Sequence, residues 1–350
     1  MGREDSLLVS YFPVQTYSLD CERKDAKKAY GSVANEYFAV MRSIKLKCFQ
    51  TAVHQVEKLG QPCRRQWLFV TLLAMALPAS AVELPRDIKY VAHQGEERLA
   101  PNHSIAAYKF AVAHRLDYMK LDVRETKDGV VVIQHDGTIK AMTGADLVIK
   151  DTPYVELKRY VYRARGGFTN ETIVTLPEAL AIAKAMPGIW IDFKYFKPDF
   201  AEKVLRIVAE AGITRDRMMV ATFNQTALEY MRDNHPDIRR VGHIQIIHQS
   251  EGDGYKLDFA GNEIVPTEVE AIKKIFAYRD RMKLFGVNVP CRPVPRLKYR
   301  ISKEAVRALK EGGFWVSIWF VNDPENGVYY REAGADAIVT ANAAATVPAP

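Results

Sequence analysis

The sequence has few cysteines, and none of them is spaced like a pair of metal ligands. Its 350 residues include four cysteines, Cys21, Cys48, Cys63 and Cys291, and no two form a C-x-x-C pair. Closely spaced cysteine pairs are the usual sign of a zinc site or a redox motif. Only Cys291 lies beyond residue 63, so neither a disulfide framework nor a zinc centre is indicated.

The chain also lacks a concentrated basic stripe. It carries 49 Lys and Arg against 42 Asp and Glu, a formal charge of +7, with the two signs interspersed. Nucleic-acid-binding proteins usually gather basic residues on one face or along one helix, so we expect no nucleic-acid partner. A net positive field equally suits an anionic small molecule or a membrane surface.

Repeats and long low-complexity tracts are absent apart from an Ala-rich tail, 341–350. Hydrophobic residues make up 48% of the chain and charged residues 26%, which is ordinary for a globular protein with a sizeable core. A single α/β barrel needs roughly 250 residues. The length therefore predicts one such domain with an extension.

One apolar run is flanked by charge and by small residues. Two arginines stand before the run 67–77, and the sequence Pro-Ala-Ser-Ala follows it. This order is typical of a secretory signal peptide, whereas a transmembrane anchor needs about 20 apolar residues. We predict a signal segment over 64–81, cleaved before Val82, and a periplasmic or secreted mature domain, 82–350.

Residues 1–63 stand in front of this segment, although a signal peptide ordinarily opens a chain. They mix charges with scattered aromatic residues and show no sustained helical or alternating period. We interpret them as an upstream extension that results from a mis-assigned start codon.

From residue 88 onward, short apolar segments alternate with amphipathic segments of helical length. This alternation is typical of βαβ units and a parallel sheet. The predicted strands are 88–92, 118–123, 130–134, 189–193, 218–222, 240–244, 284–289, 315–320 and 335–339. A (β/α)8 TIM-type barrel needs eight strands, so we expect one of these segments to lie outside the barrel.

Capping residues mark where helices begin. Ser104 precedes one helical segment, and Thr175 precedes another that has proline and glutamate in its first turn. Further helices are predicted after Pro198, Asn224, Thr267 and Ser302. The polar segment 245–264 is longer than most barrel loops, and a loop of that size is often a lid or specificity element.

Several motifs stand at or just after the predicted strands. In chain order they are His93-Gln94-Gly95, Pro101-Asn102-His103-Ser104, Lys120-Leu121-Asp122, Thr126-Lys127-Asp128-Gly129, His135-Asp136, Asp192-Phe193-Lys194 and Trp319-Phe320-Val321-Asn322-Asp323-Pro324. The set resembles the glycerophosphodiester phosphodiesterase family, whose pattern runs H-R-G, P-E-N-T, E-L-D, T-K-D-G, H-D, E-x-K and W-T-V-N-D-P. The resemblance implies a (β/α)8-barrel phosphodiester hydrolase and spans almost all of 82–350.

Two histidines are the candidate catalytic residues. Phosphodiester hydrolysis needs one group to remove a proton from the nucleophile and another to protonate the departing alkoxide, and histidine is suited to both near neutral pH. His93 and His135 stand at strand ends, where barrel enzymes assemble their active sites. The resemblance implies that His93 is the base or nucleophile and His135 the acid, although the residues alone leave that assignment open.

The family binds a divalent metal through four carboxylates, and this chain departs from that pattern. The corresponding positions hold Asn102, Lys120, Asp122 and Asp192. Calcium and magnesium select carboxylate-rich oxygen sites, so the loss of charge argues against a family-like metal site. The arginine that follows the first histidine in the family is Gln94 here.

We therefore consider two replacements for the metal. In the first, the Lys120 ammonium pairs with Asp122 and holds the phosphoryl oxygens, with Lys194 as a second phosphate contact. In the second, Glu96, Glu97 and His103 supply new metal ligands from the first loop. Trp319 is expected either to line the pocket mouth or to belong to the core; as a pocket residue it joins Gln94 and the lysines in binding substrate.

The resulting expectation is an exported hydrolase that acts on small or lipid-derived phosphodiesters such as deacylated phospholipid headgroups. Relatives such as spider-venom phospholipase D and agrocinopine synthase imply an alternative, a transferase or cyclising enzyme on the same fold. A second class is a non-catalytic phosphate-binding protein, and the presence of both His93 and His135 argues against it.

Overall fold

The computed structural model describes residues 87–248, 254–261, 263–291, 301–342 and 346. The predicted extension and signal segment, 1–63 and 64–81, lie outside the described residues. No helix within the described part of the chain is long and apolar enough to cross a membrane.

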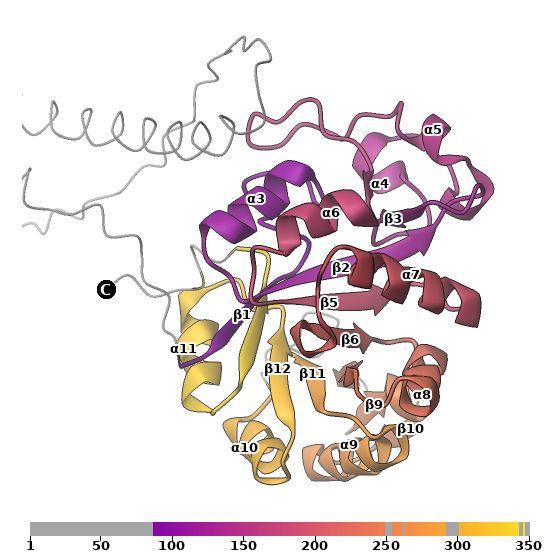
Figure 1. The fold of residues 1–350 in the computed structure, drawn as a ribbon. Helices are drawn as coiled ribbons and strands as arrows, with labels where there is room; N and C mark the ends of the chain where they lie inside the picture. The colour runs from indigo at the N-terminus through magenta and orange to yellow at the C-terminus, as the bar shows by residue number, and fades with distance from the viewer. Residues whose placement is uncertain (1–86, 249–253, 262, 292–300, 343–345, 347–350) are drawn as a thin grey trace, which may run out of the picture. The chain divides into compact units, whose positions relative to one another are not determined.

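Eight parallel strands close into a barrel because β1 pairs with both β2 and β13 (Figure 1). In order around the barrel they are β1 (Lys89–Ala92), β2 (Tyr118–Glu125), β5 (Gly188–Phe193), β6 (Met218–Thr222), β7 (Arg239–His243), β11 (Gly286–Pro290), β12 (Trp315–Trp319) and β13 (Ala337–Thr340). This closure confirms the predicted (β/α)8 TIM-type architecture.

The surplus predicted strand is β3 (Val131–Ile133), which lies outside the barrel. It pairs antiparallel with β2 and is followed along the sheet by β4 (Val174–Thr175). The cause is the short Asp128-Gly129 turn, where Gly129 has a φ of 80°. A turn this short can only return the chain antiparallel, since a parallel partner needs a crossover of about a dozen residues.

Helices surround the barrel strands, and several begin at side-chain caps. The helices are α3 (Ile105–Ala113), α4 (Lys140–Thr143), α5 (Tyr154–Leu157), α6 (Leu176–Ala183), α7 (Pro198–Glu210), α8 (Gln225–Asn234), α9 (Glu268–Met282), α10 (Lys303–Glu311) and α11 (Pro324–Glu332), with 3-10 turns η1 (Ile149–Asp151), η2 (Arg215–Arg217) and η3 (Asp258–Ala260). The predicted caps Ser104, Thr175, Asn224, Thr267 and Ser302 each accept a backbone N–H. Helices α4 and α5 belong to the excursion between β3 and β4.

Two apolar layers result from the alternation of side chains along the strands. The larger one lies between the strands and the helices. The smaller one fills the barrel interior and consists of Val91, Trp190, Met219, Ala221, Val241, Ala337 and Val339, with Tyr118, Trp315 and Trp319 packed against it. These residues identify which side chains of each strand point into the barrel.

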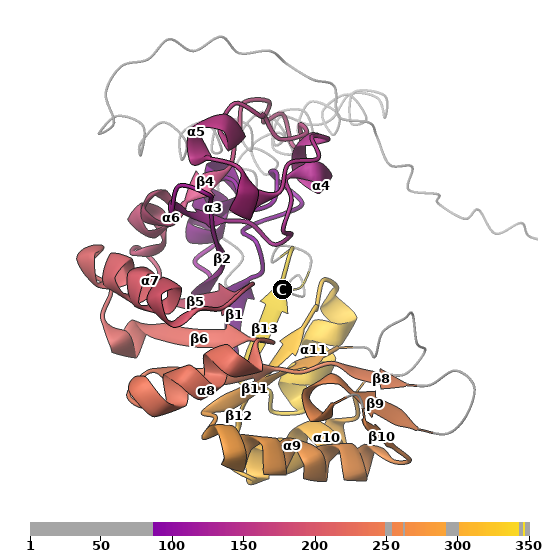
Figure 2. The same cartoon turned by 90° about the vertical axis from the view of Figure 1, so that its right-hand side faces the viewer.

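The segment after β7 forms a small sheet of its own. Strands β8 (Ile246–His248), β9 (Tyr255–Leu257) and β10 (Glu263–Val265) are antiparallel neighbours, and residues 249–253 and 262 lie outside the described residues. Figure 2 shows this sheet beside the barrel rather than in its wall. Its predicted role as a lid or specificity element stays a prediction.

Gly95 holds the first active-site loop against α3. Its φ is +86°, and an added Cβ would lie 2.6 Å from the Ala107 side chain. Gly212 has a similar φ of +77° but open space around it. Left-handed strain costs roughly 1–2 kcal/mol, and overpacking adds about 1–3 kcal/mol.

We therefore expect Gly95→Ala to lower the free energy of unfolding by the sum of both effects, and Gly212→Ala by the strain alone. Urea unfolding of the two variants beside the wild type measures this difference. Equal losses in both variants would show that the contact with Ala107 constrains nothing.

Candidate active site

The inward rows of the barrel strands change from apolar to polar at their carboxyl ends. Asp122 follows Tyr118 by four residues on β2, Asp192 follows Trp190 on β5, and His243 follows Val241 on β7. His93 continues the row of Val91 just beyond β1. Because these strands are parallel, the polar ends meet at one mouth of the barrel, where barrel enzymes carry out their chemistry.

Two aspartates and two lysines form a buried ion cluster at this mouth. Asp122 and Asp192 are direct neighbours in the register of β2 and β5. The Lys120 ammonium bonds Asp122 Oδ1 and lies 2.8 Å from Asp192 Oδ2. Lys194 Nζ is 2.9 Å from the same Asp192 oxygen and 3.7 Å from Asp122 Oδ1. The predicted pairing of Lys120 with Asp122 is thus present.

The cluster is charged on both sides despite its burial. Burial works to raise the pKa of both aspartates, but Lys120 and Lys194 outweigh it and lower the pKa of Asp192 to about 2 and that of Asp122 well below its usual range. Burial also works to lower the pKa of Lys120, and the two carboxylates reverse this and raise it. The four groups therefore carry two negative and two positive charges.

His103 forms a hydrogen bond with the second carboxylate oxygen of Asp122. Its Nε2–H donates to Asp122 Oδ2 at 2.9 Å, and its Nδ1 accepts from the Tyr108 hydroxyl at 2.9 Å. Burial lowers the pKa of His103, so the ring is neutral. Its φ of 56° is left-handed, a conformation in which Asn and His are enriched, and the family pattern has Asn here. Both ring nitrogens are engaged, so His103 has no nitrogen free to bind a metal.

The first loop holds His93 through Glu97. The Glu97 carboxylate accepts from His93 Nδ1–H with one oxygen and from the Asn102 amide, at 2.9 Å, with the other. Asn102 also donates to Gln94 Oε1 at 2.7 Å. Arg165 donates to Asn102 Oδ1 at 2.7 Å. Asn102 therefore bonds both Gln94 and Glu97, and not the aspartates of the ion cluster.

His93 is presented as a neutral base. Its side chain is largely buried, and its ring lies 4.0 Å from that of Phe320. Burial lowers its pKa, although the hydrogen bond to Glu97 acts in the opposite direction. Burial would raise the pKa of Glu97, but its bond with His93 and the nearby His103 and Arg165 lower it. Because Glu97 holds the proton on Nδ1, Nε2 of His93 keeps its lone pair.

His135 lies in a different environment. Its side chain is 49% exposed, and its Nδ1–H donates to Asp136 at 2.8 Å. The β2–β3 hairpin places the residue before His135 beside Asp122, because the Gln134 N–H donates to the Asp122 carbonyl at 2.8 Å. The Arg124 guanidinium donates a hydrogen bond of 2.6 Å to the His135 carbonyl oxygen. The His135 ring bonds Asp136 and the His93 ring bonds Glu97, and the two histidines share no hydrogen bond among those of the described residues.

Sequence reasoning missed a fourth histidine of the site, His243, which ends strand β7. His243 is 3% exposed, its Nδ1 accepts from the Asn288 amide at 3.0 Å, and Asn288 Oδ1 accepts from the Ser317 hydroxyl at 2.8 Å. Burial lowers its pKa to about 3. This chain of bonds places the proton on Nε2, which has no hydrogen-bond partner within the described part of the chain and lies 3.7 Å from Asp192. The sequence signal that could have identified His243 is its position near the end of the predicted strand 240–244.

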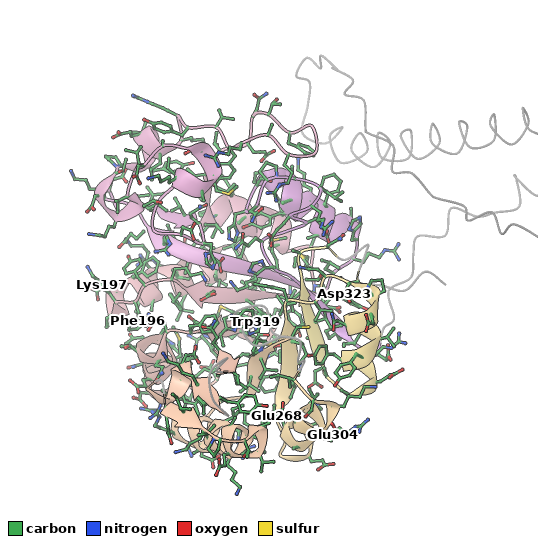
Figure 3. The ribbon with its side chains drawn as sticks, turned by 180° about the vertical axis from the view of Figure 1, so that it is seen from behind. Phe196, Lys197, Glu268, Glu304, Trp319 and Asp323 are labelled. Carbon is green, nitrogen blue, oxygen red and sulfur yellow. The ribbon has the colours of Figure 1, made fainter. Side chains whose placement is uncertain are left out.

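Trp319 packs against the apolar layer inside the barrel and stands at the carboxyl end of its strand. It ends β12 (Figure 3), is only partly buried, and donates from Nε1 to the Asn288 carbonyl at 3.1 Å. Phe223 packs edge-on against its ring at 5.8 Å, and Phe320 at 5.2 Å. Phe223 and Phe320 are themselves 42% and 41% exposed. Together the three aromatic rings make an apolar rim next to the charged cluster.

The fold and the site define a class of protein, a (β/α)8-barrel enzyme with histidine, carboxylate and ammonium groups at the carboxyl ends of its strands. The sequence model described as the Glycerophosphoryl diester phosphodiesterase family matches residues 93–345. The chain therefore belongs to this family and is a phosphodiesterase.

Similar proteins agree with this assignment. A glycerophosphodiester phosphodiesterase of Caldanaerobacter subterraneus subsp. tengcongensis is 28% identical over 196 residues, which cover 53% of this chain and 80% of the relative. One of Bacillus altitudinis is 28% identical over 217 residues, 57% of this chain and 86% of the relative. A phosphodiesterase of Oleispira antarctica, solved with the product sn-glycerol-3-phosphate, has the same fold, with a TM-score of 0.56, 21% identity and coverage of 74% and 93%.

Members of this family generally use a divalent cation, but the side chains here do not fit one. Within the described residues, no group of three or more His, Cys, Asp or Glu side chains is arranged to hold a metal ion. Of the positions that the resemblance assigns to the metal, only Asp122 and Asp192 lie together, and Lys120 bridges them. Glu97 is bonded to His93 and Asn102.

Proposed function

We propose that this chain hydrolyses small, lipid-derived phosphodiesters, in particular glycerophosphodiesters, with His93 as the base and His135 as the acid. The observation that carries the proposal is the buried His93–Glu97 pair at the mouth of the barrel. Two relatives bear the name glycerophosphodiester phosphodiesterase, and the Oleispira phosphodiesterase was solved with sn-glycerol-3-phosphate. These likenesses support the substrate class.

The proposed base step uses the free lone pair of His93. Nε2 takes a proton from a water molecule, the water oxygen forms a bond to phosphorus, and the bond from phosphorus to the leaving oxygen breaks. Glu97 stabilises the imidazolium that forms, because its carboxylate already accepts from Nδ1–H. A neutral, oriented imidazole suits this role, since a base has to be deprotonated before the reaction.

The proposed acid step uses the exposed histidine. The departing alcohol leaves toward solvent, and His135 stands at the solvent-facing rim with 49% of its side chain exposed. Its imidazolium gives a proton to the leaving alkoxide, so that the products are a phosphomonoester and an alcohol. The difference in burial between His93 and His135 supports this division of roles, which the sequence left open.

Three donors would hold the phosphoryl oxygens. Lys120 on β2 and Lys194 just beyond β5 lie in the ion cluster, and His243 has a buried Nε2–H with no hydrogen-bond partner among the described residues. Preorganised donors stabilise the charge that develops on phosphoryl oxygens in the transition state. The Gln94 amide, whose oxygen accepts from Asn102, keeps its N–H donors for the substrate, and the aromatic rim around Trp319 is suited to the alcohol moiety.

A transferase or cyclising reaction differs only in the nucleophile, because a substrate hydroxyl replaces water. The names of the relatives, glycerophosphodiester phosphodiesterases, favour hydrolysis. A pure binding protein would need neither an oriented neutral histidine nor a second histidine at the rim. The arrangement of His93 and Glu97 therefore favours an enzyme.

We also propose that the protein is exported and is cleaved before Val82. The support is the order of charged, apolar and small residues in 64–81. N-terminal sequencing of the protein from its native host is expected to give Val82 as the first residue. Peptides from 1–63 in the mature protein would contradict both the cleavage and the mis-assigned start.

The hydrolysis proposal is tested with the full chain on glycerophosphodiesters and on aryl phosphodiesters. We expect His93→Ala to lower kcat by about 100-fold or more on both substrates. His135→Ala is expected to lose as much on glycerophosphodiesters but little on aryl diesters, because a weakly basic phenolate leaves without a proton. His235→Ala, whose ring bonds Glu202 on the helical layer, is the matched control.

Two results would contradict the proposal. Absence of turnover by the wild type on every diester would favour a non-catalytic binding protein. Equal losses for His135→Ala on both substrate classes would remove His135 from the acid role.

The pH dependence tests Glu97 as a positioning residue. A base has to be unprotonated, so kcat/KM falls as pH drops through the pKa of His93, which burial holds below 6.5. Glu97 raises that pKa, so Glu97→Gln should move the acidic limb to still lower pH and lower kcat by about 100-fold. Glu178→Gln, which removes a carboxylate from the α6 capping box, should leave the limb in place. An unchanged limb in Glu97→Gln would contradict the assignment.

A further inference from the structure

Lys120 Nζ occupies the position from which a cation would bridge the two aspartates. Asp122 and Asp192 face each other across the β2–β5 register, and the ammonium lies within bonding distance of Asp122 Oδ1 and 2.8 Å from Asp192 Oδ2. Calcium or magnesium would need to lie about 2.0–2.6 Å from the same oxygens. The ammonium and a bridging metal ion cannot both occupy that space.

The charges lead to the same conclusion. The two carboxylates are balanced by the ammonium groups of Lys120 and Lys194, so the cluster presents no net negative charge to a divalent cation. A dication brought into contact with Lys120 would meet strong repulsion, because like charges interact most strongly where solvent is excluded.

Among the described residues, the side chains around the aspartates supply no substitute ligands. Asp122 Oδ2 accepts from His103, and both nitrogens of that ring are engaged. Asn102, at the position of the family glutamate, bonds Gln94 and Glu97 instead. The alternative in which His103 and the first loop recruit a metal therefore lacks free donors at the aspartates.

We propose that the Lys120 ammonium is a built-in cation that replaces the divalent metal of the family, so that this phosphodiesterase turns over without one. An ammonium has three N–H donors, and the two aspartates take two of them. The third is available to a phosphoryl oxygen, beside the Lys194 ammonium. The proposal rests on the proposed function for its catalytic part alone, because metal binding is measured independently.

The first experiment measures metal binding through thermal unfolding of the full chain. The wild type should have the same Tm in excess chelator and in millimolar Ca²⁺ or Mg²⁺. Lys120→Glu restores the carboxylate of the family pattern and brings three carboxylates together. This variant should be destabilised in chelator and gain about 3 °C or more on adding either ion, because a ligand that binds only the folded state stabilises it.

The second experiment measures turnover with the same additions. The wild type should retain its rate in excess chelator, and Lys120→Met should lose about 100-fold or more without rescue by either ion. Lys310→Met is the matched control. Lys310 pairs with Asp336 at the opposite end of the barrel, so its loss removes a partly exposed lysine–aspartate pair but should leave the rate and the chelator response unchanged.

Several results would overturn the proposal. A wild-type Tm that rises with Ca²⁺ or Mg²⁺, or a wild-type rate lost in chelator and recovered with metal, would each show that Lys120 does not replace the ion. Lys120→Glu that folds but gains no stability from metal would do the same. If Lys120→Glu fails to fold, the wild-type Tm and Lys120→Met still decide. A wild type without turnover in any condition would defeat the proposed function, while the Tm comparison would still test metal binding.

Discussion

The structure of the active site depends on the neutralisation of two aspartates that face each other inside the barrel. Asp122 and Asp192 are register partners on adjacent strands, in a place that water does not reach. Removing one partner of a buried ion pair costs about 3–5 kcal/mol, because it leaves a charge uncompensated. Lys120 and Lys194 supply the compensation, and His103 takes the remaining oxygen of Asp122. The positions of the neighbouring side chains follow from this cluster.

The histidines of the site differ in burial and in hydrogen bonding, and therefore in what each ring can do. His93 and His243 are enclosed and neutral, yet opposite nitrogens carry their protons, because Glu97 accepts from Nδ1–H of His93 while Asn288 donates to Nδ1 of His243. One ring can therefore accept a proton, and the other can donate a hydrogen bond to an anion. His135 remains in contact with solvent.

Much of the fold could be predicted from the sequence, because its signals are local. All nine predicted strands are present, and each capping residue begins a helix, since alternation and side-chain caps act within a few residues. The sequence left open which of the nine lies outside the barrel, and the structure shows that it is the 130–134 segment, which follows the short turn at Asp128-Gly129. The family motifs likewise located His93, Lys120, Asp122 and Asp192 at one mouth, because parallel strands carry their ends to the same edge.

The hydrogen-bond partners within the site could not be predicted from the sequence, because most of them join residues far apart in the chain. Three such contacts depend on side-chain directions and distances. Glu97 bonds His93, and Asn102 bonds Gln94. Asn288 and Ser317, on two other strands, determine which nitrogen of His243 carries the proton. The sequence by itself determined the barrel, the family and the exchange of a carboxylate for Lys120. Only the tertiary structure decided that the Lys120 ammonium lies between both aspartates, because that contact requires the register of β2 against β5.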